Sequence, residues 1–234
     1  MTAPPLAGRT AVVAGASRGI GLAIAEELMA AGAHVVRLAR SLTDHDQERR
    51  TDLRCDLTRA EEVAAAAARV IASRGAPDIL VHNAGAFLVA RLVETTPAAF
   101  GEQLTANLVA PFLVLRAFLP PMLERGSGLV VTIGSIGDHV PLPGNAAYVA
   151  AKHGLRGLHG ALSLELRGTG VRATLISPGP VNTEIWDPVD PDNRPEFTKR
   201  AAMLRPEDVA EAVLFVATRP DRVVIPELHV EPRP

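Results

Sequence analysis

The chain has 234 residues, of which 47% are hydrophobic and only 3% aromatic, and its formal net charge is −2. This length fits one large α/β domain or two small ones. The nearly neutral charge excludes a whole-chain attraction to nucleic acid or to an anionic membrane. Cys55 is the only cysteine, so no intramolecular disulfide can form, and we expect it to be buried at a strand end.

The amino-terminal residues 1–7 lack the charged and apolar regions of a secretory signal. No continuous apolar run reaches the roughly 18 residues that a membrane span requires. We therefore expect a soluble, cytoplasmic protein.

Short apolar runs alternate with helical patterns along the whole chain. The apolar runs predict strands at 10–14, 34–39, 53–55, 78–82, 129–133, 171–176 and 223–225. Helices are predicted at 20–31, 61–73, 97–125, 146–167 and 206–218, and the polar residues 41–51 are predicted to form a loop.

Continuous apolar strands that alternate with helices are typical of a parallel sheet covered on both faces. We predict one α/β domain over residues 1–234, a Rossmann-type, doubly wound parallel sheet of about seven strands. The stretch 178–195 is the one long irregular segment, rich in proline and acidic residues, and the loop that contains it is placed at about 178–205. A loop of this length is predicted to act as a lid or a binding loop.

A glycine-rich segment follows the first predicted strand and opens a helix: Gly15-Ala16-Ser17-Arg18-Gly19-Ile20-Gly21. Glycine lets the backbone turn tightly and approach a phosphate, and the helix N-terminus presents free N–H groups to the anion. The spacing is G-x-x-x-G-x-G rather than G-x-G-x-x-G. Its place after the first strand predicts a dinucleotide-binding site.

Arg40 ends the second predicted strand, in Leu38-Ala39-Arg40-Ser41. In NAD-selecting folds an acidic residue near this point binds the ribose 2′-hydroxyl, whereas an arginine accommodates a 2′-phosphate. The acidic residue is missing here, and Arg18 is a second cation in the glycine segment. We predict that NADP(H) is preferred over NAD(H); the alternative is two solvated arginines in an arginine-rich chain.

Tyr148 is the only tyrosine, and Lys152, one of two lysines, follows four residues later. Positions i and i+4 share one face of a helix. An ammonium group beside a phenol favours the phenolate, and tyrosine, with a pKa near about 10, needs such help to act near neutral pH. The pair predicts proton transfer; a packing tyrosine beside a solvated lysine is the structural alternative.

Together with further motifs in order along the chain, these residues resemble the classical short-chain dehydrogenase/reductase family over nearly the whole length. The motifs are the glycine segment, Asp56-Leu57, Asn83-Ala84-Gly85, Asn107, Ser135, Tyr148-x-x-x-Lys152, and Pro178-Gly179 followed by Thr183. The resemblance implies a Rossmann-type fold, hydride transfer to or from a nicotinamide, and a homo-oligomer, usually a dimer or tetramer.

The resemblance also implies a role for each matched residue. Tyr148 would exchange a proton with the substrate oxygen, and Ser135 would orient that oxygen. Lys152 would lower the pKa of Tyr148 and bind the nicotinamide ribose, and Asn107 would hold a water that links Lys152 to solvent. The other matched residues would contact the cofactor. At the adenosine end these are Asp56, at adenine, with its neighbour Leu57, and Asn83, Ala84 and Gly85. Toward the nicotinamide they are Thr183, at the carboxamide, with its neighbours Pro178, Gly179 and Val181.

Two positions depart from the family pattern. Ala14 precedes the glycine segment where a threonine is usual, and His82 precedes Asn83 where a second asparagine is usual. We expect His82 to be structural rather than catalytic. His139, between Ser135 and Tyr148, and Trp186 are candidates for the substrate pocket, and no metal site is predicted.

The sequence thus predicts an NADP(H)-dependent oxidoreductase of a small-molecule carbonyl or alcohol, with neither a nucleic-acid nor a membrane partner. One alternative is a 3-oxoacyl-[acyl-carrier-protein] reductase, in which Arg125 and Arg167 could bind an acidic carrier at the pocket mouth. A sugar-nucleotide epimerase is disfavoured by the short chain and the glycine spacing. A non-catalytic NADPH sensor is disfavoured because the Ser-Tyr-Lys set is intact.

Two expectations concern exposed surfaces. The helix at 146–167 carries small or apolar residues on more than one of its faces. We therefore expect it to bury a second face against something other than its own sheet. With residues 108–115 it is predicted to pair with its copy across a two-fold axis, and the resemblance points to a tetramer. Trp186, the only tryptophan, is predicted to be partly exposed without ligand and more buried once cofactor and substrate bind.

Overall fold

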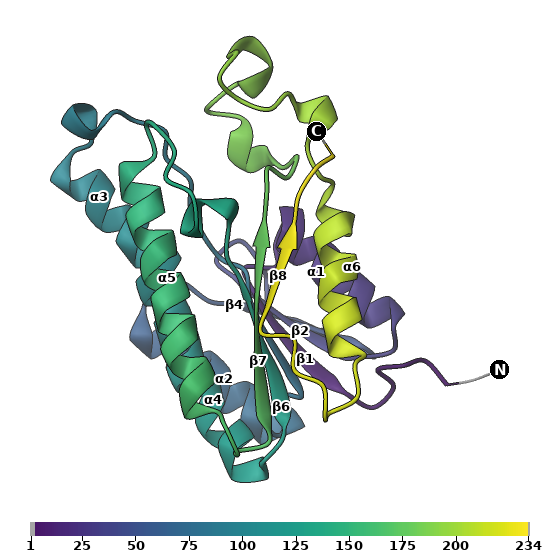
Figure 1. Cartoon of the computed structure of the whole chain (residues 1–234). Coiled ribbons are helices and arrows are strands. Elements are labelled where there is room, and N and C mark those ends of the chain that lie inside the picture. Colours follow the sequence, from purple (N-terminus) through teal and green to yellow (C-terminus); the bar gives the residue numbers. More distant parts are fainter. Residues whose placement is uncertain (1–2, 234) are drawn as a thin grey trace.

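A computed structural model describes residues 3–233 and shows one twisted eight-stranded sheet with helices on both faces (Figure 1). The strand order is β3-β4-β2-β1-β5-β6-β7-β8, and every neighbouring pair is parallel except β3 and β4. The strands are β1 Thr10–Ala14, β2 His34–Ala39, β3 His45–Gln47, β4 Arg50–Arg54, β5 Ile79–His82, β6 Gly128–Ile133, β7 Val171–Pro178 and β8 Glu227–Val230. The predicted Rossmann-type architecture is confirmed.

The order of the strands places a topological switch point beside β1. The chain builds outward from β1 through β2 to β4, then returns to pair β5 with the other side of β1, with Val12 opposite Leu80. In open α/β sheets, ligands bind in the crevice at the carboxyl ends of the strands at such a point. The glycine segment and the Asn83 motif follow β1 and β5, so both lie at this edge.

Two layers of helices cover the sheet (Figure 1). Helices α1 (Gly19–Ala30) and α6 (Pro206–Ala217) lie on one face and bury residues such as Ile24 and Val213 against it. The other face carries α2 (Ala60–Arg74), α4 (Ala110–Arg125) and α5 (Ala146–Glu165), and its core includes Phe118. Because the strands are buried on both faces, they are continuous apolar runs, as expected for parallel strands.

The two edges of the sheet differ from the sequence-based expectation. Residues 41–51 are not only a loop, because β3 pairs antiparallel with the start of β4 and makes an eighth strand. At the other edge the predicted strand at 223–225 is wrong, and the strand is β8, four residues later. Both edge strands are rich in polar residues, so the apolar signal that located the inner strands was absent there.

The helix predicted at 97–125 is one continuous helical stretch with an irregular centre. It consists of α3 (Pro97–Leu104), a π-helical turn (Thr105–Val109) and α4. Pro97–Arg125 is long and apolar enough to cross a membrane by length and composition. In the fold, however, its apolar side chains Val114, Phe118 and Met122 are buried under the sheet, as in the core helix of a globular protein.

The segment between β7 and α6 rises above the carboxyl ends of the strands (Figure 1). It contains three short 3-10 helices, Glu184–Trp186, Pro191–Asn193 and Arg200–Ala202, and no α-helix. A backbone bridge between Val181 and Leu204 ties its two ends together. The segment therefore stands over the edge of the sheet where the glycine segment lies.

Candidate active site

A cleft with a volume of about 1310 Å³ opens at the carboxyl ends of the central strands. Of the site residues predicted from the sequence, all except Gly21 and His139 line it. The cleft runs from the glycine segment and Arg40, past the Asn83 motif, to Ser135, Tyr148 and Lys152. The fold thus brings residues from six strand ends (β1, β2, β4, β5, β6 and β7) and from α5 into one site.

The glycine segment forms a cradle that side chains would fill. A Cβ at Gly15 would lie 2.6 Å from the backbone of Ala84, and one at Gly21 would lie 2.0 Å from the carbonyl oxygen of Gly15. Gly15 and Gly19 also have positive φ angles of 85° and 55°, which favour glycine. Arg18 is the N-cap of α1 and makes no side-chain capping hydrogen bond, so the first-turn N–H groups remain available to an anion.

Two arginines stand at the adenosine end of this cradle. Arg18 and Arg40 are exposed, line the cleft, and have no ion-pair partner within residues 3–233. Asp56 lies near Arg40, but its carboxylate accepts hydrogen bonds from the backbone N–H and the hydroxyl of Thr58. Those bonds lower the pKa of Asp56, with a further contribution from the Arg40 charge. Both guanidinium groups are therefore free to bind a phosphate.

Asn83 fastens the neighbouring motif to the glycine segment. Its side-chain amide donates to the carbonyl oxygen of Gly15 over 2.9 Å, and its backbone N–H donates to Ala14 over 3.0 Å. His82, one residue earlier, is 1% exposed, and burial lowers its pKa to about 3. It points into the protein rather than the cleft, which agrees with a structural role.

Tyr148 and Ser135 face each other where the cleft reaches α5. A hydrogen bond from Ser135 favours the Tyr148 phenolate, but burial of the ring outweighs it and raises the pKa of Tyr148 to about 12. The net pKa of Tyr148 is therefore raised rather than lowered as expected, because burial dominates, and Tyr148 is a neutral phenol near neutral pH. The ring of Phe87 packs edge-on against Tyr148, with 4.9 Å between ring centroids.

Lys152 lies one helical turn beyond Tyr148 and points into the same site. It is only 5% exposed, and its Nζ lies 5.8 Å from the centroid of the Tyr148 ring. Nζ donates to the carbonyl oxygens of Ile133 and Gly134 at the end of β6, over 3.2 and 3.1 Å. Burial lowers the pKa of Lys152 to about 8, opposed by the negative charge of Asp138.

Asn107 lies in the π-helical turn and is fully buried. Its side-chain amide donates to the carbonyl oxygen of Ala86 over 2.9 Å and accepts from the N–H of Ala86 over 3.2 Å, which fixes the chain next to Gly85. Pro111, four residues later, has no N–H to donate to the carbonyl of Asn107. π turns are frequent at functional sites, and this one places Asn107 at the cleft.

The segment above the sheet covers the reacting end of the cleft. A Cβ added at Gly19 would lie only 3.2 Å from the side chain of Thr183. Thr183 therefore packs against the glycine segment. Trp186 is 9% exposed, its indole N–H donates to the carbonyl of Val181 over 3.1 Å, and its ring contacts Phe87 and Phe197. The expected partial exposure of Trp186 is therefore wrong: these contacts bury the ring while it still lines the cleft.

Three other predicted placements differ from the structure. His139 does not line the cleft; its imidazole turns toward β8, where Nε2 lies 2.7 Å from a carboxylate oxygen of Glu227. Arg125 binds the carbonyl oxygens of Ala76 and Pro77, before β5 begins, and Arg167 follows α5 before β7 begins. Both arginines thus lie at the amino ends of the strands, away from the cleft mouth.

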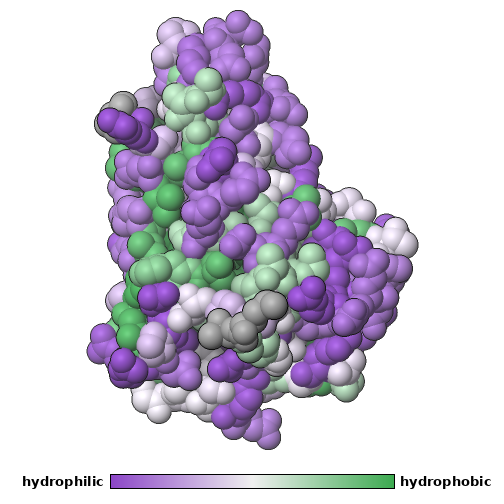
Figure 2. All heavy atoms as spheres, turned by 90° about the vertical axis from the view of Figure 1, so that its right-hand side faces the viewer, coloured by the Kyte–Doolittle hydropathy of each residue, from purple (hydrophilic) through white to green (hydrophobic). Residues whose placement is uncertain are grey.

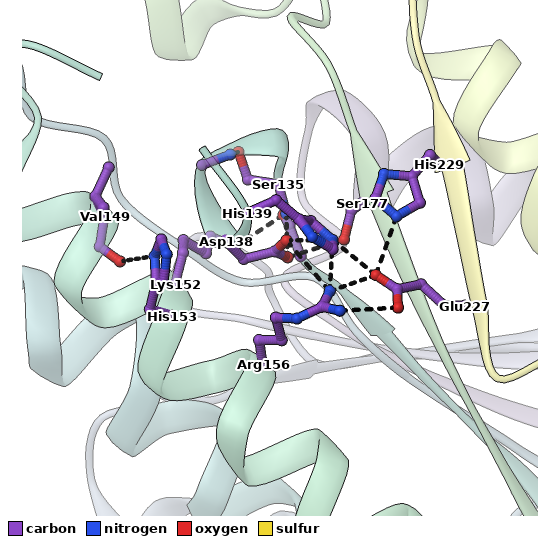
Figure 3. Close-up of polar contacts among 12 residues, drawn as sticks. Ser135, Asp138, His139, Val149, Lys152, His153, Arg156, Ser177, Glu227 and His229 are labelled. Atoms are coloured by element: carbon purple, nitrogen blue, oxygen red, sulfur yellow. Dashed lines mark hydrogen bonds and ion pairs between the residues drawn. The ribbon is translucent and has the colours of Figure 1, made fainter. Parts of the chain in front are cut away.

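A buried polar network behind Ser135 was not foreseen (Figure 3). Asp138 is 1% exposed, and its carboxylate accepts from the backbone N–H of Ser135 and the hydroxyl of Ser177. Farther out, Arg156 forms a two-point ion pair with Glu227. The available signal was the spacing Ser135-x-x-Asp138, which is that of a capping box and is observed as one.

Comparisons with known proteins agree with this geometry. A family model described as short chain dehydrogenase matches residues 9–194. An uncharacterized oxidoreductase of Staphylococcus epidermidis is 31% identical over 230 residues, covering 96% of this chain and 97% of that protein. A D-beta-hydroxybutyrate dehydrogenase of Rhizobium meliloti is 36% identical over 195 residues, 79% of this chain and 76% of that protein.

A solved structure is similar over almost the full length. The crystal structure of a metagenomic short-chain oxidoreductase in complex with NADP has a TM-score of 0.80 and 35% sequence identity, and covers 98% of this chain and 99% of that one. The family model covers well over half of the chain, and the sheet order, the glycine cradle and the cleft agree with it. The chain belongs to the short-chain dehydrogenase family of oxidoreductases, which bind a nicotinamide cofactor.

Proposed function

We propose that this protein reduces a ketone or aldehyde with NADPH, or oxidises the corresponding alcohol with NADP⁺, with Tyr148 as general acid or base. The observation that carries the proposal is the meeting of Ser135, Tyr148 and Lys152 at one end of a cleft whose other end is the glycine cradle. This arrangement lets a substrate carbonyl lie against the phenol while a dinucleotide occupies the rest of the cleft.

Each residue has a defined task in this proposal. The neutral phenol of Tyr148 donates a proton to the carbonyl oxygen as negative charge develops there. The Ser135 oxygen already accepts from the N–H of Gly137 over 3.1 Å, so its own hydroxyl proton is directed to the substrate oxygen or to Tyr148. The Lys152 ammonium stabilises the phenolate that results. When bound, NADPH supplies the hydride.

The cofactor contacts follow from the cradle. The N–H groups at the start of α1 bind the pyrophosphate, Asp56 and Asn83 to Gly85 flank the adenosine, and Thr183 and Val181 hold the nicotinamide end. The Asn107 backbone carbonyl, which receives no N–H from Pro111, holds a water near Lys152. We also propose a cytoplasmic location, in keeping with a reaction that draws on soluble NADPH.

A 3-oxoacyl-carrier reductase is the weaker candidate, because Arg125 and Arg167 lie at the wrong ends of the strands. The test is a panel of ketones, aldehydes and a 3-oxoacyl pantetheine thioester, assayed by loss of NADPH absorbance. Turnover of carbonyls other than the thioester supports the proposal. Turnover of the thioester alone supports the carrier-linked reaction, and binding of NADPH without any turnover supports a sensor.

Arg40→Asp is expected to change the choice of cofactor. Wild-type protein should bind NADPH more tightly than NADH, because an unpaired guanidinium faces the 2′-phosphate position. The variant removes that cation and adds a repulsive charge, so NADPH affinity should fall by roughly tenfold to a hundredfold, about 1.4 to 2.8 kcal/mol, while NADH affinity should not fall.

Fluorescence titration of both cofactors measures this effect. Arg222→Asp makes the same charge change at an exposed arginine that does not line the cleft, and it should leave both affinities unchanged. Equal affinities of the wild type for NADPH and NADH would contradict the assigned role of Arg40.

We further propose that the protein is a homo-oligomer, a dimer or tetramer. The α4–α5 side exposes Val109, Phe112 and Leu164, with exposed fractions of 42%, 45% and 58%. On the side of α6 and β8, Figure 2 shows a hydrophobic band in a mostly hydrophilic surface, and Phe215 and Val224 are exposed there. Two apolar faces on one protomer are sufficient for a tetramer with two kinds of two-fold interface.

Light scattering at micromolar concentration tests this arrangement. A tetramer built on both faces should become a dimer with either Phe112→Asp or Phe215→Asp, and a monomer with both. A dimer should respond to only one of the two variants. A monodisperse wild-type monomer would refute the proposal.

A further inference from the structure

We propose that Asp138 is the counter-ion of Lys152 and a positioning residue for Ser135. Asp138 ends the 3-10 helix Ile136–Asp138, directly after Ser135, and it is almost completely buried. A buried carboxylate is retained only where hydrogen bonds and an opposite charge compensate its lost hydration. Its catalytic consequence rests on the proposed function, whereas its effect on the charge of Lys152 does not.

One oxygen of Asp138 holds the Ser135 turn. Oδ2 accepts from the backbone N–H of Ser135 over 3.0 Å and from the Ser177 hydroxyl over 2.8 Å. It fits there because residue 134 is glycine: a Cβ on Gly134 would lie 2.2 Å from Oδ2. The carboxylate therefore fixes the backbone of Ser135 and, through it, the direction of its hydroxyl.

Gly134 also contacts Lys152. Nζ donates to the carbonyl oxygens of Ile133 and Gly134, and no carboxylate lies within 4.0 Å of it in residues 3–233. The ammonium and the Asp138 carboxylate thus lie against the same short piece of backbone, away from bulk water. In such a setting the attraction between opposite charges is weakly screened. Consistent with this, the Asp138 charge raises the pKa of Lys152 against the effect of burial.

Two other basic side chains, Arg156 and His139, also lie near Asp138 (Figure 3). The guanidinium of Arg156 lies 3.9 Å from Oδ1 but is bound at two points to Glu227, which also contacts His229. His139 places Nε2 3.1 Å from Oδ1. The hydrogen bond and charge of Glu227 raise the pKa of Arg156 more than the Asp138 charge does, so Glu227 is the main partner of Arg156, although Asp138 acts on it as well.

The remaining titratable groups around this pair are few. From α5, Tyr148 and His159 face Asp138; burial raises the pKa of Tyr148 and lowers that of His159 to about 4, and the Asp138 charge adds an upward contribution to both. From β5, His82 faces Lys152, and burial together with the Lys152 charge keeps it neutral. Asp138 is thus the acidic group that acts on both Lys152 and Tyr148 within residues 3–233.

Carbon-13 NMR of the lysine Cε atoms tests the charge of Lys152 directly. The chain has only two lysines, so Lys199→Arg leaves a single signal, that of Lys152. Asp138→Asn keeps the size of the side chain and removes its charge, and the titration midpoint of Lys152 should then fall by about one pH unit or more from its wild-type value. An unchanged midpoint would overturn the proposal.

Ser177→Ala is the matched control, because it removes a hydrogen bond to Asp138 but keeps the carboxylate. Its Lys152 midpoint should stay close to that of the wild type. If Asp138→Asn is unstable, Asp138→Ser provides a second neutral side chain for the same titration. A shift of equal size in Ser177→Ala and Asp138→Asn would show a packing effect and would also overturn the counter-ion role.

The pH profile of carbonyl reduction gives the second readout. Reduction needs the ammonium form of Lys152 and the phenol form of Tyr148, and both protons are lost as the pH rises. Because Asp138 raises both pKa values, its neutralisation lowers both, so the alkaline limb of the reduction rate should move to lower pH in Asp138→Asn.

A merely structural role would lower the rate at every pH without moving that limb, and this result would count against the proposal. If the wild type reduces no carbonyl, the proposed function fails and the NMR titration alone decides the counter-ion role. If the wild type reduces carbonyls while the NMR midpoint is unmoved, the proposed function stands and the counter-ion role fails.

Discussion

Tyr148→Phe is expected to lower the rate of carbonyl reduction on the order of 10²- to 10⁴-fold, the usual contribution of a positioned general acid. Only the hydroxyl is removed, and the phenylalanine ring can keep the edge-on contact with Phe87. The folded structure and the NADPH affinity should therefore stay close to those of the wild type. Steady-state kinetics of the variant, with NADPH binding measured in parallel, separates the two effects.

A lower kcat with an unchanged cofactor affinity assigns the loss to proton donation. If the variant keeps a substantial fraction of the wild-type kcat, Tyr148 is not the proton donor. Loss of NADPH binding together with activity would instead mean that the substitution disturbs the cleft itself.

Gly21→Ala should abolish or greatly weaken cofactor binding. The added methyl would lie 2.0 Å from the carbonyl oxygen of Gly15 and 2.6 Å from the side-chain amide of Asn83, so the glycine segment must move. Forced expansion of a well-packed site usually costs about 1 to 3 kcal/mol of stability. We expect a lower Tm and an NADPH affinity reduced by about tenfold or more, which is about 1.4 kcal/mol.

Gly160→Ala is the control for this variant. Gly160 lies inside α5, and a Cβ there would meet no atom within 4 Å. Alanine is favoured over glycine in a helix interior by about 1 kcal/mol, so this change should leave binding unchanged and should not lower the Tm. NADPH binding of wild-type strength by Gly21→Ala would show that the glycine segment is not the cofactor cradle.

The inner part of the fold could be predicted because burial leaves a strong pattern in the sequence. The strands at 10–14 and 34–39 were located to the residue, since both faces of each are covered and most of their residues are apolar. The edge strands β3 and β8 were missed or misplaced because none of their residues is buried: β3 is fully exposed, and β8 is at most half-buried. Val223 to Ile225 is apolar but lies in the connection before Glu227.

The candidate site was predictable where chemistry requires particular residues at fixed spacing. Glycines are needed at 15, 19 and 21 for steric reasons, and Tyr148 and Lys152 are one helical turn apart. Other features depend on contacts between distant segments, which no local pattern records. The burial of Trp186 against Phe87, the turn of His139 toward Glu227, and the contact of Asp138 with Ser177 are all of this kind.

Transfer of deuterium tests most directly the claim that this protein moves a hydride between a nicotinamide and a carbonyl. NADPH labelled with deuterium at C4 is incubated with the protein and the ketone that gives the fastest turnover, and the alcohol is analysed by mass spectrometry. With NADPH labelled at the C4 position whose hydride is transferred, each alcohol molecule should carry one deuterium on its carbinol carbon, and Tyr148→Phe should give about 10²- to 10⁴-fold less product. Alcohol without deuterium from either face-labelled form, or no alcohol from any carbonyl despite saturating NADPH, would contradict the claim.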